Sequence, residues 1–419
     1  MEIDFEKASF KDFENIESCH MYARASIFND YLNFLDRRGH LNYRMESASG
    51  CGPEMDILIP GKSKPETLVG LVSNDYLGFT QHPKIKQAVM SATEQYGTGA
   101  GASPAIGGHF SFHQRLEQKI ASFFHRSSAI LYTTGYTANS ATFQCLLQKQ
   151  DIAILDMAVH ASVYEGCQLT NVKIFLHNNL DQLERALKDA KDKYRNKMVV
   201  IDGVYSQDGD IAPLDKILQL TRHYGAYLAI DDAHGTGVIG KTGRGVLELD
   251  DLFTQVDLIT GTFSKTFASV GGYVIASAEL IRFLKFQSRQ HLFSATSTPS
   301  AAGIIKAIEL VDEEPHWMAK LWQNIHYFKQ GLLDLGMDVG TTESAIIPVK
   351  IGDPQKTAEA GRLLLEQGVY TNPIIYPAVS KKNARIRMSL MATHTKEQLD
   401  KTLNAFEYVD NKIGISKKK

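Results

Sequence analysis

The chain has 419 residues, a length typical of roughly two or three domains with a full hydrophobic core. It carries 45 Lys and Arg against 47 Asp and Glu, a formal net charge of −2, and 43% of its residues are hydrophobic. This composition excludes disordered, collagen-like and coiled-coil chains, and its near-neutral balance gives no indication of a surface for nucleic acid or an anionic membrane. The four cysteines, Cys19, Cys51, Cys145 and Cys167, predict neither a disulfide framework nor a zinc site, and no metal is expected.

The first predicted segment, residues 1–67, is an N-terminal arm that mixes charged and aromatic residues. Its apolar residues have helical spacing from Ile27 to Leu41, and Gly50 and Gly52 then interrupt the pattern. The first residues lack the basic and apolar regions of a secretory signal, and no stretch approaches about 18 uninterrupted apolar residues. We therefore expect a soluble, cytoplasmic protein without a transmembrane segment.

Residues 68–305 alternate short apolar runs with helix-length amphipathic segments. The runs begin at Ala129, Ile152, Val172, Met198, Ala226 and Asp257. Runs of this length are typical of strands buried on both faces, as in a mainly parallel sheet with crossover helices. The pattern predicts a large α/β domain.

Residues 306–419 predict a smaller α+β domain. A long amphipathic segment passes through Trp317 and Trp322, and later apolar runs begin at Ala345 and Ile386. The long segment is typical of a helix, and the two apolar runs are typical of strands.

One segment matches two phosphate-binding patterns. Gly235–Thr242 satisfies G-x-x-x-x-G-K-[ST], and its first six residues satisfy G-x-G-x-x-G. A phosphate loop needs a strand directly before the first glycine and a helix at the lysine, whereas four residues separate Ile230 from Gly235, and Gly243 and Gly245 follow Thr242. The context favours a structural loop.

The strongest chemical signal is Lys265, which follows the predicted strand at 257–260. A partly desolvated lysine at a strand end is a candidate Schiff-base amine, although a lysine in that setting is more often a surface residue. Asp231 and His234 follow another strand, and ligands of open α/β sheets bind at that edge. Taken singly, Asp231 also fits a helix N-cap and His234 a core histidine. A third group, Thr133–Tyr136, offers hydroxyl and backbone N–H groups for a phosphate at a helix N-terminus, so the three groups together predict one pocket.

In this order the motifs resemble those of the α-oxoamine synthases, pyridoxal-phosphate enzymes of fold type I. The resemblance spans about residues 68–405 and rests on Ser73–Gly78, Tyr96–Gly99, His113–Glu117, His160–Ser162, Asp202–Asp210, Asp231–Gly240, Gly243–Gly245 and Gly261–Lys265. It implies a large domain with a mainly parallel seven-stranded sheet, a smaller C-terminal α+β domain and an N-terminal arm. It also implies a homodimer with shared active sites.

The resemblance assigns roles to individual residues. It implies that Lys265 forms the Schiff base with pyridoxal 5′-phosphate and later moves protons at the substrate α-carbon. Asp231 would hold the pyridinium nitrogen, His160 would stack on the ring, and Ser206 and His234 would lie near its 3′-oxygen. We expect Lys265, His160, Asp231 and His234 to take part in catalysis.

Further residues are expected to bind phosphate or substrate. The phosphate would be held by Gly135, Tyr136, Thr262 and Ser264, with Ser294 supplied by the other subunit. Arg387 would bind the carboxylate of the amino acid, with assistance from Asn74, since a guanidinium can donate two parallel hydrogen bonds.

The implied reaction joins an amino acid to an acyl thioester with loss of CO2. Ser389–Thr395, Asn372-Pro373, Pro377–Val379 and Gly261–Lys265 are most similar to bacterial serine palmitoyltransferase and to related sulfonolipid cysteate acyltransferases. The segments at 102–109 and 44–52 depart from that pattern. We expect serine or cysteate to react with a long-chain thioester of coenzyme A or acyl carrier protein, giving a 3-oxo amine precursor of sphingolipids or sulfonolipids. The alternatives are 8-amino-7-oxononanoate synthase, which joins alanine to a pimeloyl thioester in biotin synthesis, a glycine C-acyltransferase, or an aminotransferase on the same fold.

Overall fold

The computed structural model describes residues 3–17, 19–295 and 298–417. It divides the chain into two compact units, one of Met1–Ser73 with Trp322–Lys419 and one of Asn74–Leu321. Helix α11 (His316–Asp334) carries the chain from the second unit into the first. This grouping joins the predicted N-terminal arm to the C-terminal segment, while the boundaries predicted at 67 and 305 stay predictions.

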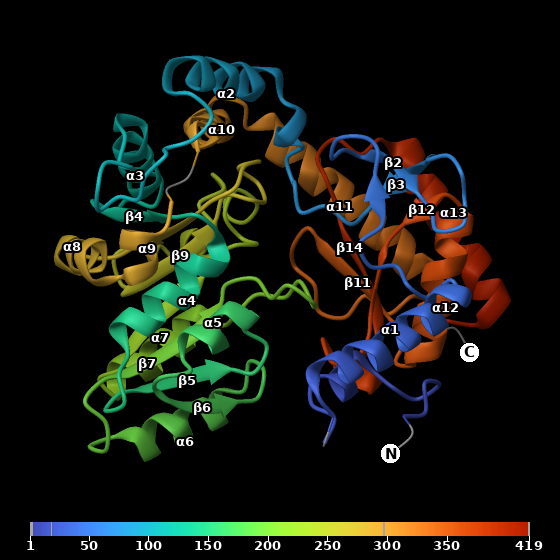
Figure 1. Cartoon of the computed structure of the whole chain (residues 1–419), viewed down its shortest axis with the longest axis horizontal. Helices are drawn as coiled ribbons and strands as arrows, with labels where there is room; N and C mark the ends of the chain where they lie inside the picture. The colour runs from blue at the N-terminus through green and yellow to red at the C-terminus, as the bar shows by residue number, and fades with distance from the viewer. Residues whose placement is uncertain (1–2, 18, 296–297, 418–419) are drawn as a thin grey trace. The chain divides into compact units, whose positions relative to one another are not determined.

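The second unit is built on a seven-stranded sheet with strand order β4-β10-β9-β8-β7-β5-β6. Strands β4, β9, β7, β5 and β6 of this sheet are labelled in Figure 1. Its strands are β4 (Ala129–Tyr132), β5 (Ile152–Asp156), β6 (Asn171–Phe175), β7 (Lys197–Asp202), β8 (Tyr227–Asp231), β9 (Leu258–Thr262) and β10 (Gly272–Ile275). Strands β9, β8, β7, β5 and β6 pair in parallel, and β10 runs antiparallel to both of its neighbours. The predicted α/β fold with a mainly parallel seven-stranded sheet is confirmed.

The helices of this unit lie before, between and after its strands along the chain. They are α2 (Pro83–Tyr96), α3 (Ser111–Phe123), α4 (Gly135–Leu146), α5 (Ala161–Gly166), α6 (Leu180–Ala190), α7 (Leu214–His223), α8 (Ala278–Gln287), α9 (Arg289–Phe293) and α10 (Ala302–Glu313). Short 3-10 helices lie at Phe79–Gln81, Val246–Glu248 and Pro299–Ala301. The strands other than β6 are largely buried because helices cover them; Ile130, Leu155 and Val200 join Ala138 and Phe143 of α4 in one apolar core. The run at Val172, predicted to be buried on both faces, forms the edge strand β6 instead, and only its last residue, Phe175, is buried.

The first unit contains two small sheets, ordered β1-β2-β3-β12 and β11-β14-β13. Their strands are β1 (Glu46–Ser47), β2 (Glu54–Leu58), β3 (Glu66–Gly70), β11 (Ile346–Lys350), β12 (Val369–Tyr370), β13 (Asn372–Ile374) and β14 (Arg385–Ser389). Its helices are α1 (Met21–Arg37), α12 (Pro354–Glu366) and α13 (Lys396–Ile413), with 3-10 turns at Phe10–Phe13 and Lys381–Asn383. Strand β3 pairs in parallel with β12, so the N-terminal segment contributes strands to a sheet that the sequence did not predict.

The helices of the described ranges include none with the length and apolar character needed to cross a membrane.

Candidate active site

A cavity of about 230 Å³ lies at the carboxyl ends of the central strands of the second unit. Loops after β4, β5, β7, β8 and β9 contribute its walls, as the topology requires because these ends share one edge of the sheet. The lining includes most of the predicted site residues: Gly135, Tyr136, His160, Ser206, Asp231, His234, Thr262, Ser264 and Lys265. The structure therefore brings together residues from Gly135 to Lys265, which lie far apart in the sequence.

Asp231 ends β8 at the wall of this cavity and is 7% exposed. Its carboxylate accepts hydrogen bonds from Asn139 Nδ2 at 2.6 Å and from the backbone N–H of Ala233 at 3.0 Å. Asn139 Nδ2 also donates to Ser162 Oγ at 3.0 Å. These donors fix the orientation of the carboxylate.

His160 lies after β5 and caps the start of α5. Its Nδ1 is 2.8 Å from Ser162 Oγ, and the ring of Tyr136 meets it edge-on with centroids 5.8 Å apart. Removal of water by the cavity walls lowers the pKa of His160; the ammonium group of Lys265 adds to this, and Asp231 opposes it. The imidazole is therefore neutral at neutral pH.

The first turn of α4 and the loop after β9 form a small polar cradle. Thr134 caps α4 by accepting a hydrogen bond from the N–H of Thr137, and Gly135 follows it. A Cβ at Gly135 would lie 2.6 Å from Cβ of Thr262, so only glycine allows this close approach. Thr262 Oγ1 is 2.8 Å from Ser264 Oγ. Helix-terminal N–H groups beside two hydroxyls are the donor set that a phosphate requires, so the cradle fits the phosphate of the expected cofactor.

The lining also includes the polar side chains of Asp202 and Asn139, which were not predicted as site residues. Asp202 ends β7 in register with Asp231, is 3% exposed and accepts a hydrogen bond from the backbone N–H of His160 at 3.4 Å. Burial raises the pKa of Asp202 well above its usual range, and the nearby charge of Asp231 adds to the rise. The position of Asp202 at the end of a strand was a sequence signal for this site. Asn139 instead lies on α4, one helical turn beyond Gly135.

The prediction for Asn74 concerns a residue that is linked to His234 through Tyr76. Tyr76 OH lies 2.6 Å from His234 Nδ1 and donates to Asn74 Oδ1 at 3.4 Å. Asn74 is thus connected to the cavity wall through Tyr76, which the sequence did not single out. The proposed contact of Asn74 with substrate stays a prediction.

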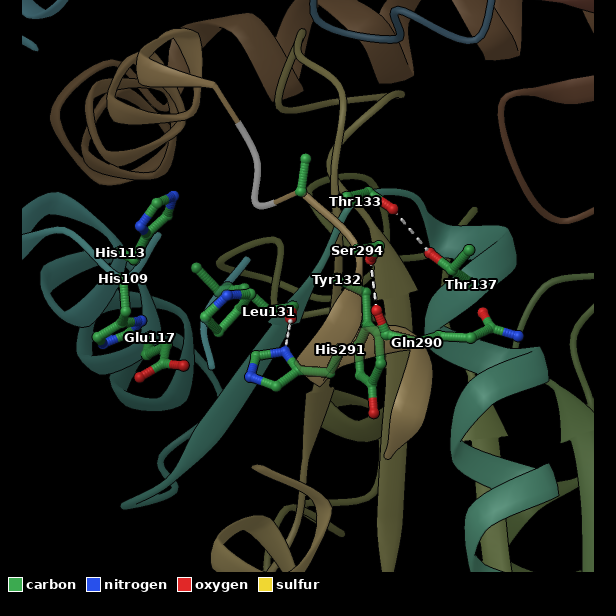
Figure 2. A pocket seen from close by; sticks show the side chains of 12 residues that line it. His109, His113, Glu117, Leu131, Tyr132, Thr133, Thr137, Gln290, His291 and Ser294 are labelled. Carbon is green, nitrogen blue, oxygen red and sulfur yellow. Dashed lines mark hydrogen bonds between the residues drawn. The ribbon is translucent and has the colours of Figure 1, made fainter. Parts of the chain in front are cut away.

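Ser294 and Arg387 lie outside this cavity. Ser294 lines a separate cavity of about 20 Å³ with His109, His113 and His291, and its hydroxyl donates to the backbone oxygen of Gln290 (Figure 2). Since Ser294 was expected to act in the other subunit, that role stays a prediction. Arg387 lies on β14 of the first unit, where it is 6% exposed and donates to Ser389 Oγ at 3.1 Å; its role also stays a prediction.

The glycine-rich loop after β8 surrounds an internal carboxylate. Asp232 is fully buried, and its Oδ2 accepts from the N–H of Val246 at 3.1 Å. A Cβ at Gly235 would lie 2.1 Å from Asp232 Oδ1, one at Gly245 would lie 1.7 Å from Oδ2, and one at Gly203 would lie 2.6 Å from Oδ1. Burial raises the pKa of Asp232 well above its usual range. In the apparent phosphate pattern, Gly235 thus makes room for Asp232, while a Cβ at Gly237 or Gly240 would lie 2.2 Å from Thr266 or Glu248, so packing within the loop explains the pattern.

Comparison with known proteins places the site in a family context. Residues 66–406 match the model of the aminotransferase class I and II family. The 8-amino-7-oxononanoate synthase of Thermoanaerobacter pseudethanolicus is 43% identical over 361 residues, covering 85% of this chain and 90% of that protein. A structure of serine palmitoyltransferase with pyridoxal phosphate as an internal aldimine is 31% identical, with a TM-score of 0.87 over 93% of this chain and 98% of the other. The 8-amino-7-oxononanoate synthase of Francisella tularensis has a TM-score of 0.71 at 22% identity, covers 82% of this chain and 98% of its own, and shows the shared fold.

Proposed function

Because this chain belongs to the class I and II aminotransferase family and, within it, to the pyridoxal-phosphate-dependent α-oxoamine synthases, we propose that it joins alanine to a pimeloyl thioester and releases CO2. In this reaction the α-carbon of alanine forms a bond to the acyl carbon, the thioester C–S bond breaks, and the carboxylate leaves as CO2. The products are 8-amino-7-oxononanoate and the free thiol of the acyl carrier. The main observation that supports this proposal is the cavity, which brings together Lys265, Asp231 and the start of α4.

Each part of the cavity has a task in this proposal. Pyridoxal phosphate, when bound, supplies a carbonyl for the amine and a pyridinium ring that takes up the electron pair released at the α-carbon. The α4 N-terminus with Thr262 and Ser264 would hold its phosphate, and Asp231 would hold its ring nitrogen. Lys265 Nζ would provide the amine and move the proton at the substrate α-carbon. In a homodimer, Ser294 of each subunit would contribute its hydroxyl to the phosphate site of the other subunit.

The choice of alanine and a pimeloyl group is supported by sequence identity. The relative that is 43% identical over most of both chains is named for that product. This replaces the lipid substrates expected from local motifs such as Ser389–Thr395, because identity over 361 residues outweighs similarity in a few short segments. The aminotransferase alternative predicts transfer of the amino group to an oxo acid without release of CO2.

A second candidate is the condensation of serine or cysteate with a long-chain acyl thioester. The higher TM-score with serine palmitoyltransferase favours it. The two candidates differ in both substrates, which makes them separable in one experiment.

That experiment gives purified holoenzyme alanine, serine, cysteate or glycine, each with pimeloyl and palmitoyl thioesters of coenzyme A and of acyl carrier protein. Product mass and CO2 release are measured, with Lys265→Ala as the inactive control. Turnover of alanine with the pimeloyl thioester supports the proposal. A long-chain amino ketone from serine or cysteate refutes it and establishes the second candidate, and amino transfer without CO2 refutes both.

A further inference from the structure

His177, which follows β6, contacts two carboxylates with its two ring nitrogens. Nδ1 lies 3.1 Å from Asp156 Oδ1 and Nε2 lies 2.9 Å from Asp210 Oδ2. The Asp156 side chain is fully buried and that of Asp210 is 11% exposed. An imidazole can donate to both acceptors only when both nitrogens carry protons. The geometry therefore favours an imidazolium that joins the ends of two loops.

The first of these loops leads to His160. Asp156 is the last residue of β5, and its Oδ1 accepts a hydrogen bond from the N–H of Ala158 at 2.8 Å, two residues before His160. Its Oδ2 accepts from the N–H of Asn178 at 2.8 Å. The orientation of the Asp156 carboxylate, fixed from the His177 side, thus determines the path of the chain into the cavity wall.

The second loop carries Ser206. The N–H of Tyr205 donates to the backbone oxygen of Asp210 at 3.0 Å, and the N–H of Gly209 donates to Tyr205 at 2.8 Å, so residues 205–210 form a closed turn. The Tyr205 ring stands against the His177 ring with centroids 4.3 Å apart and planes at 81°. His177 therefore contacts this turn at both ends, on either side of Ser206, which lines the cavity.

We propose that His177 is a positioning residue whose imidazolium links the loops that carry His160 and Ser206 and so sets both side chains against the cofactor ring. The inference rests on the cofactor contacts proposed for His160 and Ser206. His177 does not line the cavity, and it acts through Asp156 and Asp210.

The electrostatics agree with the geometry. Burial disfavours the charged ring, but the hydrogen bonds to Asp156 and Asp210 outweigh it and raise the pKa of His177 to about 10. The titratable side chains that contact the ring include these two carboxylates and Tyr205. The imidazolium is thus expected to persist through the pH range in which such an enzyme is assayed.

The first test uses apoprotein without substrate, so it is independent of the proposed reaction. His177→Gln removes the charge, and His223→Gln, an exposed histidine of α7, is the matched control. We expect the dissociation constant for pyridoxal phosphate to rise at least tenfold in His177→Gln and to stay within twofold of wild type in the control. An unchanged affinity in His177→Gln would overturn the inference.

A double-mutant cycle separates positioning from general destabilisation. Ser206→Ala is expected to weaken cofactor binding in the wild-type background and to change it less than twofold in His177→Gln, because Ser206 is already displaced there. Equal factors in both backgrounds would refute the link. If His177→Gln does not fold, Asp210→Asn removes one of the two carboxylates in the same cycle.

The charge itself is measured by NMR of imidazole-labelled apoprotein. His177 is expected to carry both ring protons at pH 8, whereas a ring that titrates near its ordinary value of about 6.5 would overturn the inference. A protein that passes these tests but turns over neither acyl thioester refutes the proposed function and leaves this inference intact.

Discussion

Replacing Gly135 with alanine tests the cradle at the start of α4. The added Cβ would lie 2.6 Å from Cβ and 2.9 Å from Oγ1 of Thr262, both part of the sheet strand β9. Since ordinary carbon contacts begin at about 3.5 Å, α4 and β9 must separate by roughly 1 Å. A displacement of that size breaks a phosphate hydrogen bond from the first turn, which costs about 1.5–3 kcal/mol for a charged acceptor. The dissociation constant for pyridoxal phosphate should therefore rise about 10- to 100-fold, at 1.4 kcal/mol per factor of ten.

The assay titrates apoprotein with pyridoxal phosphate and follows its absorbance, while thermal unfolding of the apoprotein reports the packing cost separately. Gly99→Ala is the control, because a Cβ there meets nothing within 4 Å. If Gly135→Ala binds the cofactor as tightly as Gly99→Ala, the cradle does not hold the phosphate, and the assignment of Thr262 and Ser264 fails with it.

Three further predictions concern other parts of the chain. Lys265→Ala should abolish the visible absorption of lysine-bound cofactor and lower turnover by about 10² to 10⁴; a persistent band would refute the role of Lys265. Asn139→Ala removes the 2.6 Å hydrogen bond to Asp231 and should lower the free energy of unfolding of the apoprotein by about 1–3 kcal/mol in urea titrations, and an unchanged midpoint would contradict this. Burial lowers the pKa of His394 to about 4, below about 6.5 in the unfolded chain, so its contribution to stability is complete above pH 6.5 and is lost as the pH falls towards 4. As the pH is lowered from 7 to 4, the midpoint temperature of thermal unfolding should therefore fall less steeply in His394→Gln than in wild type. Equal slopes in the two proteins would refute this effect of His394.

The sequence predicted the parallel part of the sheet well. Strands β5, β7 and β8 are buried throughout or nearly so. An uninterrupted apolar run in the sequence is what such a buried strand requires, so these strands could be predicted. It did not predict β10, a four-residue antiparallel strand that follows β9 without an intervening helix. It also did not predict β2, whose apolar residues alternate with Glu54 and Asp56 over only five positions.

The site was predictable where its residues follow strand ends. Asp231 and Lys265 lie at or just after the carboxyl ends of parallel strands, where ligands of such sheets bind. The sequence motifs and the strand topology therefore indicate the same site. Asn139 and Tyr76 were not found, because they lie on a helix and a loop and reach the site through side-chain contacts. His177 depends on partners 21 and 33 positions away, and a pairing over that separation has no local sequence signal.

The carboxylate enclosed by Gly203, Gly235 and Gly245 has a consequence for how this sequence can change over time. At Gly235 the three atoms nearest to an added Cβ all belong to Asp232, so this glycine makes room for that carboxylate. At Gly203 an added Cβ would also lie 2.6 Å from Cγ2 of Val246, and Gly245 has a φ of +79°, which favours glycine whatever residue occupies position 232. A smaller residue at 232 would therefore remove the clash at position 235 only, whereas alanine at any one of the three glycines would clash with the present Asp232. Positions 232 and 235 should therefore change together among relatives, while glycine at 203 and 245 should persist whatever residue occupies position 232.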